Sequence, residues 1–502
     1  MIEDQLYIYR LLRELERAGR SVVLRYRDRD VSGDMLRSLI FKYARVLGDL
    51  DIGRGKLLAM FAPNRPEALA VRYAAHVLGA TTVYLSIPAN EAQRRALVEQ
   101  MAPDLLVVFP ETARCLDPKT GLAFATFGFD QAGSKGRLDG LAASMPSDPI
   151  QVAARANDLG VIASSGGSTG VPKGSCRSFG TYSAMVSARS PKDRVQLING
   201  PLAYLSQVLV DVTLLGGGRV VLRDAYDAAD TFATIEAERI TDLFLVEPQL
   251  FELMDHPRPN SYDLSSLRSL THIGASAPKS LRLRARRRFG QILTHVYGAS
   301  EMGIVSVLAP GEHDLSRPDL FTSAGRVQPG VDVRLRRMDG SFAEAGEAGT
   351  IEVRSGAMAS GYRHNPALTA RSFRDGWYVT GDLGRLDEGG CLHVIGRAVD
   401  IQDVDGRLVA PTDIEEALCQ LPTVRYAVAV VDPVSRLVTA AVVAWPGLKV
   451  EDRSCRQAVE QHFGAGLASS ILIVPVERVP LTEQGKPDRT AIGQLAQRPA
   501  AA

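Results

Sequence analysis

A segment rich in glycine and hydroxyl side chains, SSGGSTGVPKG at residues 164–174, is the part of this sequence best suited to chemistry. Glycines let several backbone N–H groups converge on an anion, and serine and threonine add donors without bulk. Lys173 adds a point charge that suits phosphate oxygens. Gly170 is followed by Val-Pro rather than by Lys-Ser or Lys-Thr, so the segment is not a Walker A loop. A flexible glycine-rich connection is the alternative, and the ordered STG-x-PKG arrangement disfavours it.

A second segment, HVYGASEMG at residues 295–303, combines an aromatic ring, a small turn and a carboxylate. Tyr297 could stack on a flat base, and Ser300 could donate to a phosphate. Glu301 suits a hard cation such as magnesium, which prefers oxygen ligands. Taken alone this segment is weak evidence, because an isolated glutamate is usually solvated.

Two later segments contain polar residues that suit a sugar and a reacting anion. Asp382 in YVTGDLGRL could accept hydrogen bonds from ribose hydroxyls, and Arg397 in VIGRAVD could donate to the same sugar. Lys486 lies in the Gly-Lys-Pro turn of PLTEQGKPDR. Considered singly, a surface ion pair and a solvated lysine are the ordinary readings of these residues.

In their order and spacing, the four segments together resemble the adenylate-forming superfamily of acyl-CoA synthetases, peptide-synthetase adenylation domains and luciferases. The resemblance covers roughly residues 22–492. It implies that ATP and a carboxylic acid react at the α-phosphate to give an acyl-AMP and pyrophosphate, with ATP and Mg²⁺ as cofactors. It also implies a large N-terminal domain of two parallel-type sheets and a small barrel, followed by a small mobile domain.

The resemblance assigns a role to individual residues. The β- and γ-phosphates would be held by Ser165, Gly166, Ser168, Thr169, Gly170 and Lys173. Adenine would lie between Tyr297, with its neighbour Gly298, and a segment formed by Ala275, Ser276 and Ala277. The ribose would be held by Asp382 and Arg397, the α-phosphate by Ser300, and magnesium by Glu301. Lys486 would bridge the carboxylate and α-phosphate oxygens, where charge builds in the transition state.

Several departures from the family pattern concern the acceptor of the acyl group. Many CoA ligases have an aromatic-His pair where this chain has Ala203-Tyr204. Val399 replaces the hinge Asp or Lys, and Gln402 replaces a lysine that serves thioester formation in several members. These changes favour the related stand-alone amide bond synthetases, which pass the acyl group to an amine. The segment GRLVAP at residues 406–411 still resembles the loop that lines pantetheine, so CoA remains the alternative acceptor.

Asp211 is the candidate base for an amine acceptor, because an amine must be deprotonated before it attacks. A solvent-facing helix residue is the competing interpretation of Asp211. Small and aromatic residues suggest a flat aryl or heteroaryl acid as the substrate, with a pocket formed by Tyr204, Gly274, Gly298 and Met302. A non-catalytic nucleotide-binding protein on the same fold is the remote alternative, and the presence of Lys486 and Glu301 speaks against it.

The hydrophobic pattern predicts the elements that position these residues. Residues 5–18 have apolar positions at helical spacing. Strand and helix patterns then alternate, with strands at 57–63, 81–87 and 105–109 and helices at 66–78 and 91–101. Such alternation with short polar joints predicts parallel sheets covered by helices, and hence an α/β fold.

The pattern changes twice in the second half of the chain. From about Ser323, short alternating segments predict a small antiparallel sheet or barrel. After residue 398 the pattern predicts a small α+β unit. We therefore expect an N-terminal domain at 1–398, with the barrel at about 323–398, and a mobile C-terminal domain at 399–502 that carries Lys486.

Composition narrows the class of protein. The 502 residues carry a net charge of only +1, which argues against a nucleic-acid partner. The arginine-rich stretch at 281–289 predicts the solvated face of a surface helix, or else a contact to a phosphorylated ligand. Five widely spaced cysteines, no signal peptide and no apolar run of about 20 residues predict a cytoplasmic protein without a membrane partner. The oligomeric state stays open.

Overall fold

The computed structural model describes residues 5–87, 90–117, 120–166, 172–257, 261–273 and 278–495. The first large sheet has a parallel centre. Its strand order is β18 (Gly361–Tyr362), β8 (Pro172–Ser178), β7 (Leu159–Gly166), β4 (Thr81–Tyr84), β3 (Leu57–Phe61), β5 (Leu105–Val108) and β6 (Phe124–Thr126). Strands β3, β4 and β5 are buried throughout, and β3 and β5 are entirely apolar, as expected for strands covered on both faces.

Helices connect and cover these parallel strands. They are α1 (Tyr7–Ala18), α2 (Gly33–Asp49), α3 (Pro66–Val77), α4 (Glu91–Met101), α5 (Leu138–Ala143) and α6 (Phe179–Met185). Every residue of α3 is buried, including Arg72 and His76. A helix buried on all sides must place its charged residues against partners inside the protein.

The second large sheet is also parallel in the middle and antiparallel at both edges. Its strand order is β15 (Arg326–Val327), β14 (Gly303–Leu308), β13 (Leu293–Ala299), β12 (Ser269–Ile273), β11 (Asp242–Leu245), β9 (Val195–Ile198), β10 (Arg219–Leu222), β1 (Val22–Tyr26) and β2 (Arg29–Ser32). Its helices are α7 (Gln207–Leu215), α8 (Ala228–Glu238), α9 (Glu247–Met254) and α10 (Lys279–Phe289). Residues 202–206 form a π-helical turn, η4, before α7.

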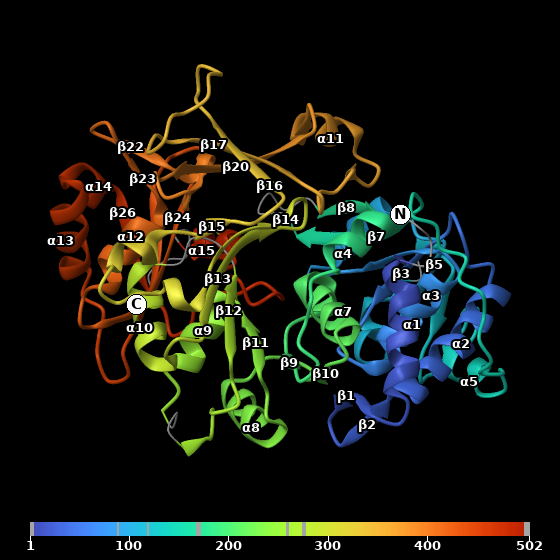
Figure 1. Ribbon diagram of the computed structural model, residues 1–502. Helices are drawn as coiled ribbons and strands as arrows, with labels where there is room; N and C mark the ends of the chain where they lie inside the picture. Colours follow the sequence, from blue (N-terminus) through green and yellow to red (C-terminus); the bar gives the residue numbers. More distant parts are fainter. Residues whose placement is uncertain are drawn as a thin grey trace.

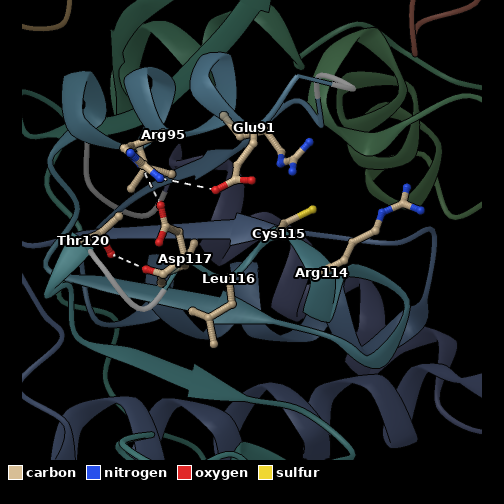
Figure 2. A pocket seen from close by; sticks show the side chains of 10 residues that line it. Glu91, Arg95, Arg114, Cys115, Leu116, Asp117 and Thr120 are labelled. Atoms are coloured by element: carbon tan, nitrogen blue, oxygen red, sulfur yellow. Dashed lines mark hydrogen bonds and ion pairs between the residues drawn. The ribbon is translucent and has the colours of Figure 1, made fainter.

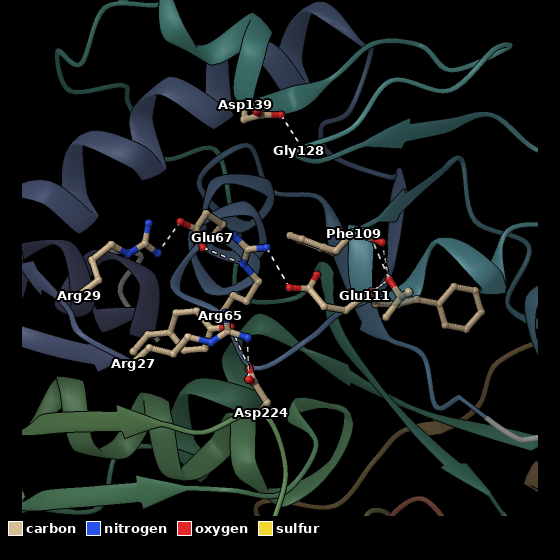
Figure 3. Close-up of polar contacts among 12 residues, drawn as sticks. Arg27, Arg29, Arg65, Glu67, Phe109, Glu111, Gly128, Asp139 and Asp224 are labelled. Atoms are coloured by element: carbon tan, nitrogen blue, oxygen red, sulfur yellow. Dashed lines mark hydrogen bonds and ion pairs between the residues drawn. The ribbon is translucent and has the colours of Figure 1, made fainter.

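A single apolar cluster joins the two large sheets. It contains side chains from β3 and β4 of the first sheet, from β1 and β10 of the second, and from α1, α2 and α3 between them. An ion pair reinforces the junction at its edge, where Arg29 of the second sheet pairs with Glu67 of α3 (Figure 3). The two sheets therefore share one core.

A smaller antiparallel sheet follows, as predicted from the change in pattern near Ser323. It is formed by β16 (Val331–Arg336), β17 (Gly349–Ser355), β20 (Trp377–Leu386), β19 (Phe373–Arg374) and β21 (Leu392–Arg397), with α11 (Pro366–Ser372) before β19. In Figure 1 this sheet lies at the top of the molecule, beside the ends of β13 and β14. The long strand β20 pairs with β21, and this pairing sets Asp382 opposite Arg397.

The last part of the chain, from β22 to α15, is called the C-terminal unit below. It contains the hairpin β22 (Gln402–Val404) and β23 (Arg407–Val409), and a sheet of β24 (Val424–Val431), β25 (Val438–Ala444) and β26 (Ile471–Pro475). Its helices are α12 (Pro411–Cys419), α13 (Asp452–Phe463), α14 (Ala465–Ser470) and α15 (Arg489–Leu495). In Figure 1 these elements, orange to red, lie beside α9 and α10.

The α/β fold class is confirmed, with parallel-centred sheets and a smaller antiparallel sheet. The predicted helix at 91–101 has the observed bounds, and the other predicted helices and strands differ by a few residues at their ends. Among the described residues, none of the helices combines the length and the apolar character needed to cross a bilayer.

Candidate active site

The tight turn between β13 and β14 brings Tyr297, Ser300 and Glu301 to one end of the second sheet. Strand β13 ends at Ala299, and β14 begins at Gly303. A Cβ atom at Gly298 would lie 2.5 Å from the carbonyl oxygen of Gly303, so only glycine allows the two strands to approach this closely.

Strand pairing in the smaller sheet adds Asp382 and Arg397 to the same place. The Tyr297 hydroxyl donates to Asp382 Oδ2 at 2.6 Å, and Arg397 Nε lies 3.1 Å from Asp382 Oδ1. Arg397 also donates to the carbonyl of Thr380 at 2.8 Å, and the Thr380 hydroxyl accepts from the backbone N–H of Asp382. The residues that the sequence predicts for the adenine and for the ribose therefore form one hydrogen-bonded group.

Burial has the largest effect on the pKa of Asp382. Burial raises the pKa of Asp382, and this effect outweighs the opposing influence of the Arg397 guanidinium and of the Tyr297 hydrogen bond. Burial likewise raises the pKa of Tyr297, with the charge of Asp382 acting in the same direction. Tyr297 therefore remains a protonated donor, and Asp382 is a nearly enclosed acceptor for hydroxyl groups.

Glu301 is held by a segment that arrives from the first sheet. The Tyr362 hydroxyl donates to Glu301 Oε1 at 3.0 Å, and the backbone N–H of Ala359 donates to the carbonyl of Glu301 at 2.7 Å. The Arg177 guanidinium lies within electrostatic reach of Glu301 and donates to the carbonyl of Ala357 at 2.7 Å. Burial lowers the pKa of Arg177 to about 10.

The described residues contain no group of three or more His, Cys, Asp or Glu side chains that could hold a metal ion. Magnesium in nucleotide sites is usually bound by one or two carboxylates together with the phosphates. A single carboxylate, Glu301, therefore fits magnesium in the presence of ATP and does not form a metal site by itself.

The glycine-rich segment joins β7 to β8, which pair antiparallel with Ser165 opposite Lys173. Ser168, Thr169 and Gly170 lie outside the described residues, as does the side chain of Ser165, and Gly166 is the last residue of β7. Lys173 Nζ lies 5.8 Å from the centre of the Tyr362 ring, in cation–π range. Lys173 thus contacts the residue that binds Glu301.

Lys486 lies in a tight turn of the C-terminal unit that packs on α9. Gly485 has φ of +77° and donates its N–H to the carbonyl of Thr482, and a Cβ there would lie 3.0 Å from the Gln249 side chain. Lys486 itself reaches solvent. Desolvation by the surrounding protein nevertheless lowers its pKa, as does the charge of Arg397, while the charge of Glu301 opposes both. The lysine is therefore within electrostatic reach of both site residues.

Contacts with α9 and α10 hold the C-terminal unit in this position. The rings of Phe251 and Tyr426 lie 4.1 Å apart, and an apolar cluster runs across the boundary. Asp255, at the end of α9, pairs with Arg284 of α10 and lies 2.9 Å from Arg425 of β24. Apolar packing and the ion pair of Asp255 with Arg425 thus both connect the C-terminal unit to α9.

Asp211 does not face solvent, contrary to one interpretation of its sequence context. Its side chain is 0 % exposed, and its two oxygens accept from Arg72 at 3.0 and 2.9 Å. The hydroxyls of Tyr73 and Tyr182 donate to the same carboxylate. This closed arrangement leaves Asp211 no access to an amine, so the structure argues against a role as base and shows a buried ion pair instead.

The predicted acid-pocket residues are only partly described. The side chain of Tyr204 lies outside the described residues, as do Gly274, Ala275, Ser276 and Ala277. Met302 is 1 % exposed and packs in the apolar cluster around Ile351 and Val353. The side chain of Met302 therefore belongs to the core beneath the site, which contradicts its prediction as a pocket residue.

The arginine-rich helix α10 binds the protein itself. Arg282 donates to the carbonyl of Ser323 at 2.7 Å, and Arg286 donates to the carbonyl of His313 at 2.9 Å. Arg284 belongs to the ion-pair group at the C-terminal unit. Arg282 is buried, which contradicts the predicted solvated face at that position, whereas Arg287 of the same helix is exposed as predicted.

A cavity of about 330 Å³ lies away from these residues, between α4 and the 3₁₀ helix η2 at Pro110–Cys115 (Figure 2). Arg95 spans its rim and pairs with Glu91 and Asp117. Burial raises the pKa of the Cys115 thiol, so this cysteine is a poor nucleophile. None of the sequence-predicted site residues lines this cavity.

Sequence reasoning missed Tyr362, Thr380 and Arg177. Tyr362 lies in GYRHNPALT, and nothing in that segment marks it as a partner of Glu301. The contact depends on β18 pairing with β8, a pairing between residues far apart in the chain. Arg177 stands among small and polar residues in PKGSCRS, so nothing in that segment marks it as buried.

Comparison with known proteins identifies the family. The family model described as AMP-binding enzyme matches residues 11–363. The chain is 30% identical to the medium/long-chain-fatty-acid–CoA ligase FadD8 of Mycobacterium tuberculosis, over 96% of this chain and 88% of the relative. It is 30% identical to the indoleacetate–CoA ligase of Aromatoleum aromaticum, over 95% of each chain.

Solved structures agree with this assignment. The amide bond synthetase McbA from Marinactinospora thermotolerans is 31% identical, covers 97% of this chain and 99% of its own, and superposes with a TM-score of 0.85. The anthranilate CoA ligase AuaEII, at 20% identity and a TM-score of 0.87, shares the fold. The chain therefore belongs to the family of AMP-binding enzymes and is an ATP-using, adenylate-forming ligase.

Proposed function

We propose that this enzyme joins a carboxylic acid to the α-phosphate of ATP at the site formed by Tyr297, Glu301, Asp382, Arg397 and Lys486, and then transfers the acyl group to an amine. The observation that supports the first step most strongly is the position of Lys486. A cation from the C-terminal unit lies within electrostatic reach of both Arg397, beside the ribose acceptor, and Glu301. A lysine placed there can meet the α-phosphate and the acid at the same time.

The binding roles follow from the contacts. Asp382, as a buried acceptor, would bind the ribose hydroxyls, and Arg397 would donate to the same sugar. Tyr297 would cover the adenine, and Ser300 would donate to the α-phosphate. Lys173 would contact the β- and γ-phosphates together with the backbone of the preceding loop. Glu301 would hold Mg²⁺, which when bound neutralises phosphate charge.

The chain's own residues lower the barrier by position and charge. A carboxylate oxygen attacks the α-phosphorus, the bond to the bridging oxygen breaks, and pyrophosphate leaves. Negative charge grows on the oxygens between the two reactants, and the Lys486 ammonium would stabilise it at short range. Holding two anions together also removes much of the entropic cost of their meeting.

In the second step, the amine nitrogen attacks the acyl carbon, loses a proton, and AMP departs. Two observations support an amine acceptor. The chain is similar to an amide bond synthetase over 97% of its length at 31% identity. The C-terminal unit is also fixed to α9 and α10 by apolar packing and by Asp255, which favours both steps occurring in one arrangement.

A CoA thioester is the second candidate product, because two curated relatives at 30% identity are CoA ligases. The substrate acid is proposed to be aryl or heteroaryl. This choice is supported by the likeness to an indoleacetate–CoA ligase and by the feruloyl-CoA synthase of Amycolatopsis sp, which is 29% identical over 86% of this chain. A cytoplasmic location is proposed from the five cysteines, all of which are free thiols.

Product analysis tests the proposal. The enzyme, ATP and Mg²⁺ are mixed with a panel of aryl, heteroaryl and fatty acids, and pyrophosphate release is measured. Each active acid is then supplied with an amine panel or with CoA, and products are identified by mass spectrometry, with Lys486→Ala as the control. Amide formation without efficient CoA use is the expected result. Efficient thioester formation without amide would overturn the proposal of an amine acceptor. Absence of pyrophosphate release with every acid would overturn the proposed activation step.

A further inference from the structure

Tyr362 contacts residues that come from both large sheets. Its strand, β18, extends the first sheet by pairing with β8, with Tyr362 opposite Ser175. Its hydroxyl reaches Glu301, which follows β13 of the second sheet. Its ring lies 5.8 Å from the ammonium of Lys173. One side chain therefore touches the lysine of the phosphate loop and the carboxylate proposed to hold magnesium.

The surroundings of Tyr362 fix its ring. The side chain is 6 % exposed, and its ring meets Phe373 edge-on at 5.5 Å between centres. Its backbone N–H donates to the Thr369 hydroxyl at 2.9 Å. A Cβ at Gly361, where φ is +148°, would lie 2.5 Å from the Thr369 side chain, so the chain can enter the strand this way only at glycine. A ring held by packing and by the backbone can orient what its hydroxyl touches.

The hydrogen bond has a definite direction. An ionised carboxylate only accepts, so the Tyr362 hydroxyl is the donor and Glu301 Oε1 is the acceptor. This bond therefore holds the carboxylate that would bind a cation. The main chain of Glu301 is held separately by Ala359, two residues before the Gly361 that begins β18. Both the backbone and the side chain of Glu301 thus depend on the same segment.

We infer that Tyr362 is a positioning residue that fixes the Glu301 carboxylate relative to Lys173, so that one bound nucleotide meets both groups. This inference rests on the proposed function, in which Glu301 holds Mg²⁺ and Lys173 contacts the phosphates. Residues that hydrogen-bond to the ligands of a metal orient those ligands, and their loss commonly weakens metal binding by about 10- to 100-fold.

The test separates the hydroxyl from the ring. Binding of a non-hydrolysable ATP analogue is measured by calorimetry with and without Mg²⁺ for the wild type, Tyr362→Phe and Tyr362→Leu. Tyr362→Phe keeps the ring beside Lys173, so metal-free nucleotide affinity should be retained while the gain from Mg²⁺ falls by about 10- to 100-fold. Tyr362→Leu should lose metal-free affinity as well. Pyrophosphate release by Tyr362→Phe should need more Mg²⁺ but approach the wild-type kcat at saturation.

Tyr26→Phe is the matched control, because Tyr26 also donates to a carboxylate, Asp224, at 2.8 Å but lies outside the site. Tyr26→Phe should leave the Mg²⁺ dependence unchanged. A double-mutant cycle with Glu301→Gln should show strong non-additivity in the Mg²⁺ term, and thermal unfolding verifies that each variant is folded. An unchanged Mg²⁺ dependence in Tyr362→Phe, or additive effects in the cycle, overturns the inference.

Failure of the proposed function gives a result that differs from failure of the inference about Tyr362. Nucleotide binding needs no acid, so the coupling between Tyr362 and Mg²⁺ is measured before any acyl-adenylate forms. A wild type that binds Mg²⁺ and nucleotide cooperatively but activates no acid would remove the proposed function and leave the role of Tyr362 in place. Loss of that cooperativity in the wild type would remove both.

Discussion

At the scale of single residues, Lys486 is the group on which the proposed chemistry depends most. Its turn is shaped by Gly485, and its charge is opposed by Arg397 and favoured by Glu301. Repulsion between two neighbouring cations raises the free energy of the free enzyme until an anion binds between them. The acid and the α-phosphate would supply that negative charge, so Lys486 is placed to stabilise the transition state more than the free enzyme.

Replacement of Lys486 by alanine should separate binding from chemistry. Loss of one preorganised charge at an oxyanion typically costs about 2.7–4 kcal/mol, or about 10²–10³ in kcat. We therefore expect pyrophosphate release by Lys486→Ala to fall by about that factor, while ATP affinity measured by calorimetry changes little. An equal loss of ATP affinity would show that Lys486 is mainly a binding residue.

The pH dependence of acyl-adenylate formation should also identify Lys486. Desolvation and Arg397 lower its pKa below the ordinary value of 10.5, so its ammonium is lost as pH rises through that lowered value. The rate of pyrophosphate release should therefore fall at a pH below that expected for an exposed lysine. Lys486→Arg should move this loss to higher pH, because a guanidinium stays protonated (pKa above about 12). If the wild type and Lys486→Arg lost activity over the same range of high pH, another group would be responsible for the loss.

At the scale of elements, the buried pair of Arg72 and Asp211 connects α3 to α7. Both side chains are 0 % exposed, and Tyr73 and Tyr182 complete the hydrogen bonding. A buried ion pair contributes little net stability, but loss of one partner leaves an uncompensated charge. The pair therefore specifies how these helices pack rather than adding greatly to the free energy of unfolding.

Asp211→Leu should consequently destabilise the protein by about 3–5 kcal/mol, measured as a shift in thermal and denaturant unfolding. The double variant Asp211→Leu/Arg72→Met should be more stable than Asp211→Leu, because it removes both charges. Asp452→Asn is the control, since the pair of Asp452 and Arg456 is exposed on α13 and should contribute about 0–1 kcal/mol. Loss of amide formation in a fully stable Asp211 variant would instead restore the hypothesis that Asp211 is a base.

The sequence was informative where local pattern determines structure. The apolar runs of β3 and β5 and the spacing of α4 were sufficient to predict those elements, because burial of one strand or one helix face is a local property. The order of the motifs indicated Tyr297, Asp382 and Arg397, which the structure brings together. Their hydrogen bonds depend on the pairing of β20 with β21, which the motifs did not show.

Other features depend on distant partners. Asp211 lies in QVLVDVTLL, a helix that is apolar on most faces, and this context indicated burial more clearly than solvent exposure. Its partner, Arg72, is 139 residues away, so no local rule could supply it. The contacts of Arg282 and Arg286 in α10 were unpredictable for the same reason, because the carbonyls they bind depend on the path of residues 313–323.

At the scale of the whole molecule, the boundary between the C-terminal unit and α9 contains two buried carboxyl groups. Glu247 belongs to α9 and Glu415 to α12, and each is within electrostatic reach of Arg489. Burial raises the pKa of both, and the charge of Glu415 adds to the effect on Glu247. Glu415 also accepts from the backbone N–H of Ala429 at 2.9 Å. Tyr426, Cys419 and Asp413 are further titratable groups that interact with the pair, and Asp400 pairs with Arg489.

This pair should make the attachment of the C-terminal unit depend on pH. Burial raises the pKa of Glu415 from 4.5 to about 7, so the attached state binds more protons than the detached state between these values. Attachment should therefore weaken as pH rises from about 4.5 through 7, and change little above the higher value.

The fluorescence of Trp445, whose ring lies 4.8 Å from the Arg284 guanidinium across the boundary, measures attachment in a Trp377→Phe background. Glu247→Gln should flatten the curve, since it removes one of the two charges. Glu416→Gln removes the charge of another carboxylate at the same boundary, one that accepts from the Ser280 N–H, and should keep the wild-type pH dependence. Equal curves for the wild type and Glu247→Gln would contradict this account and assign any pH effect to groups elsewhere.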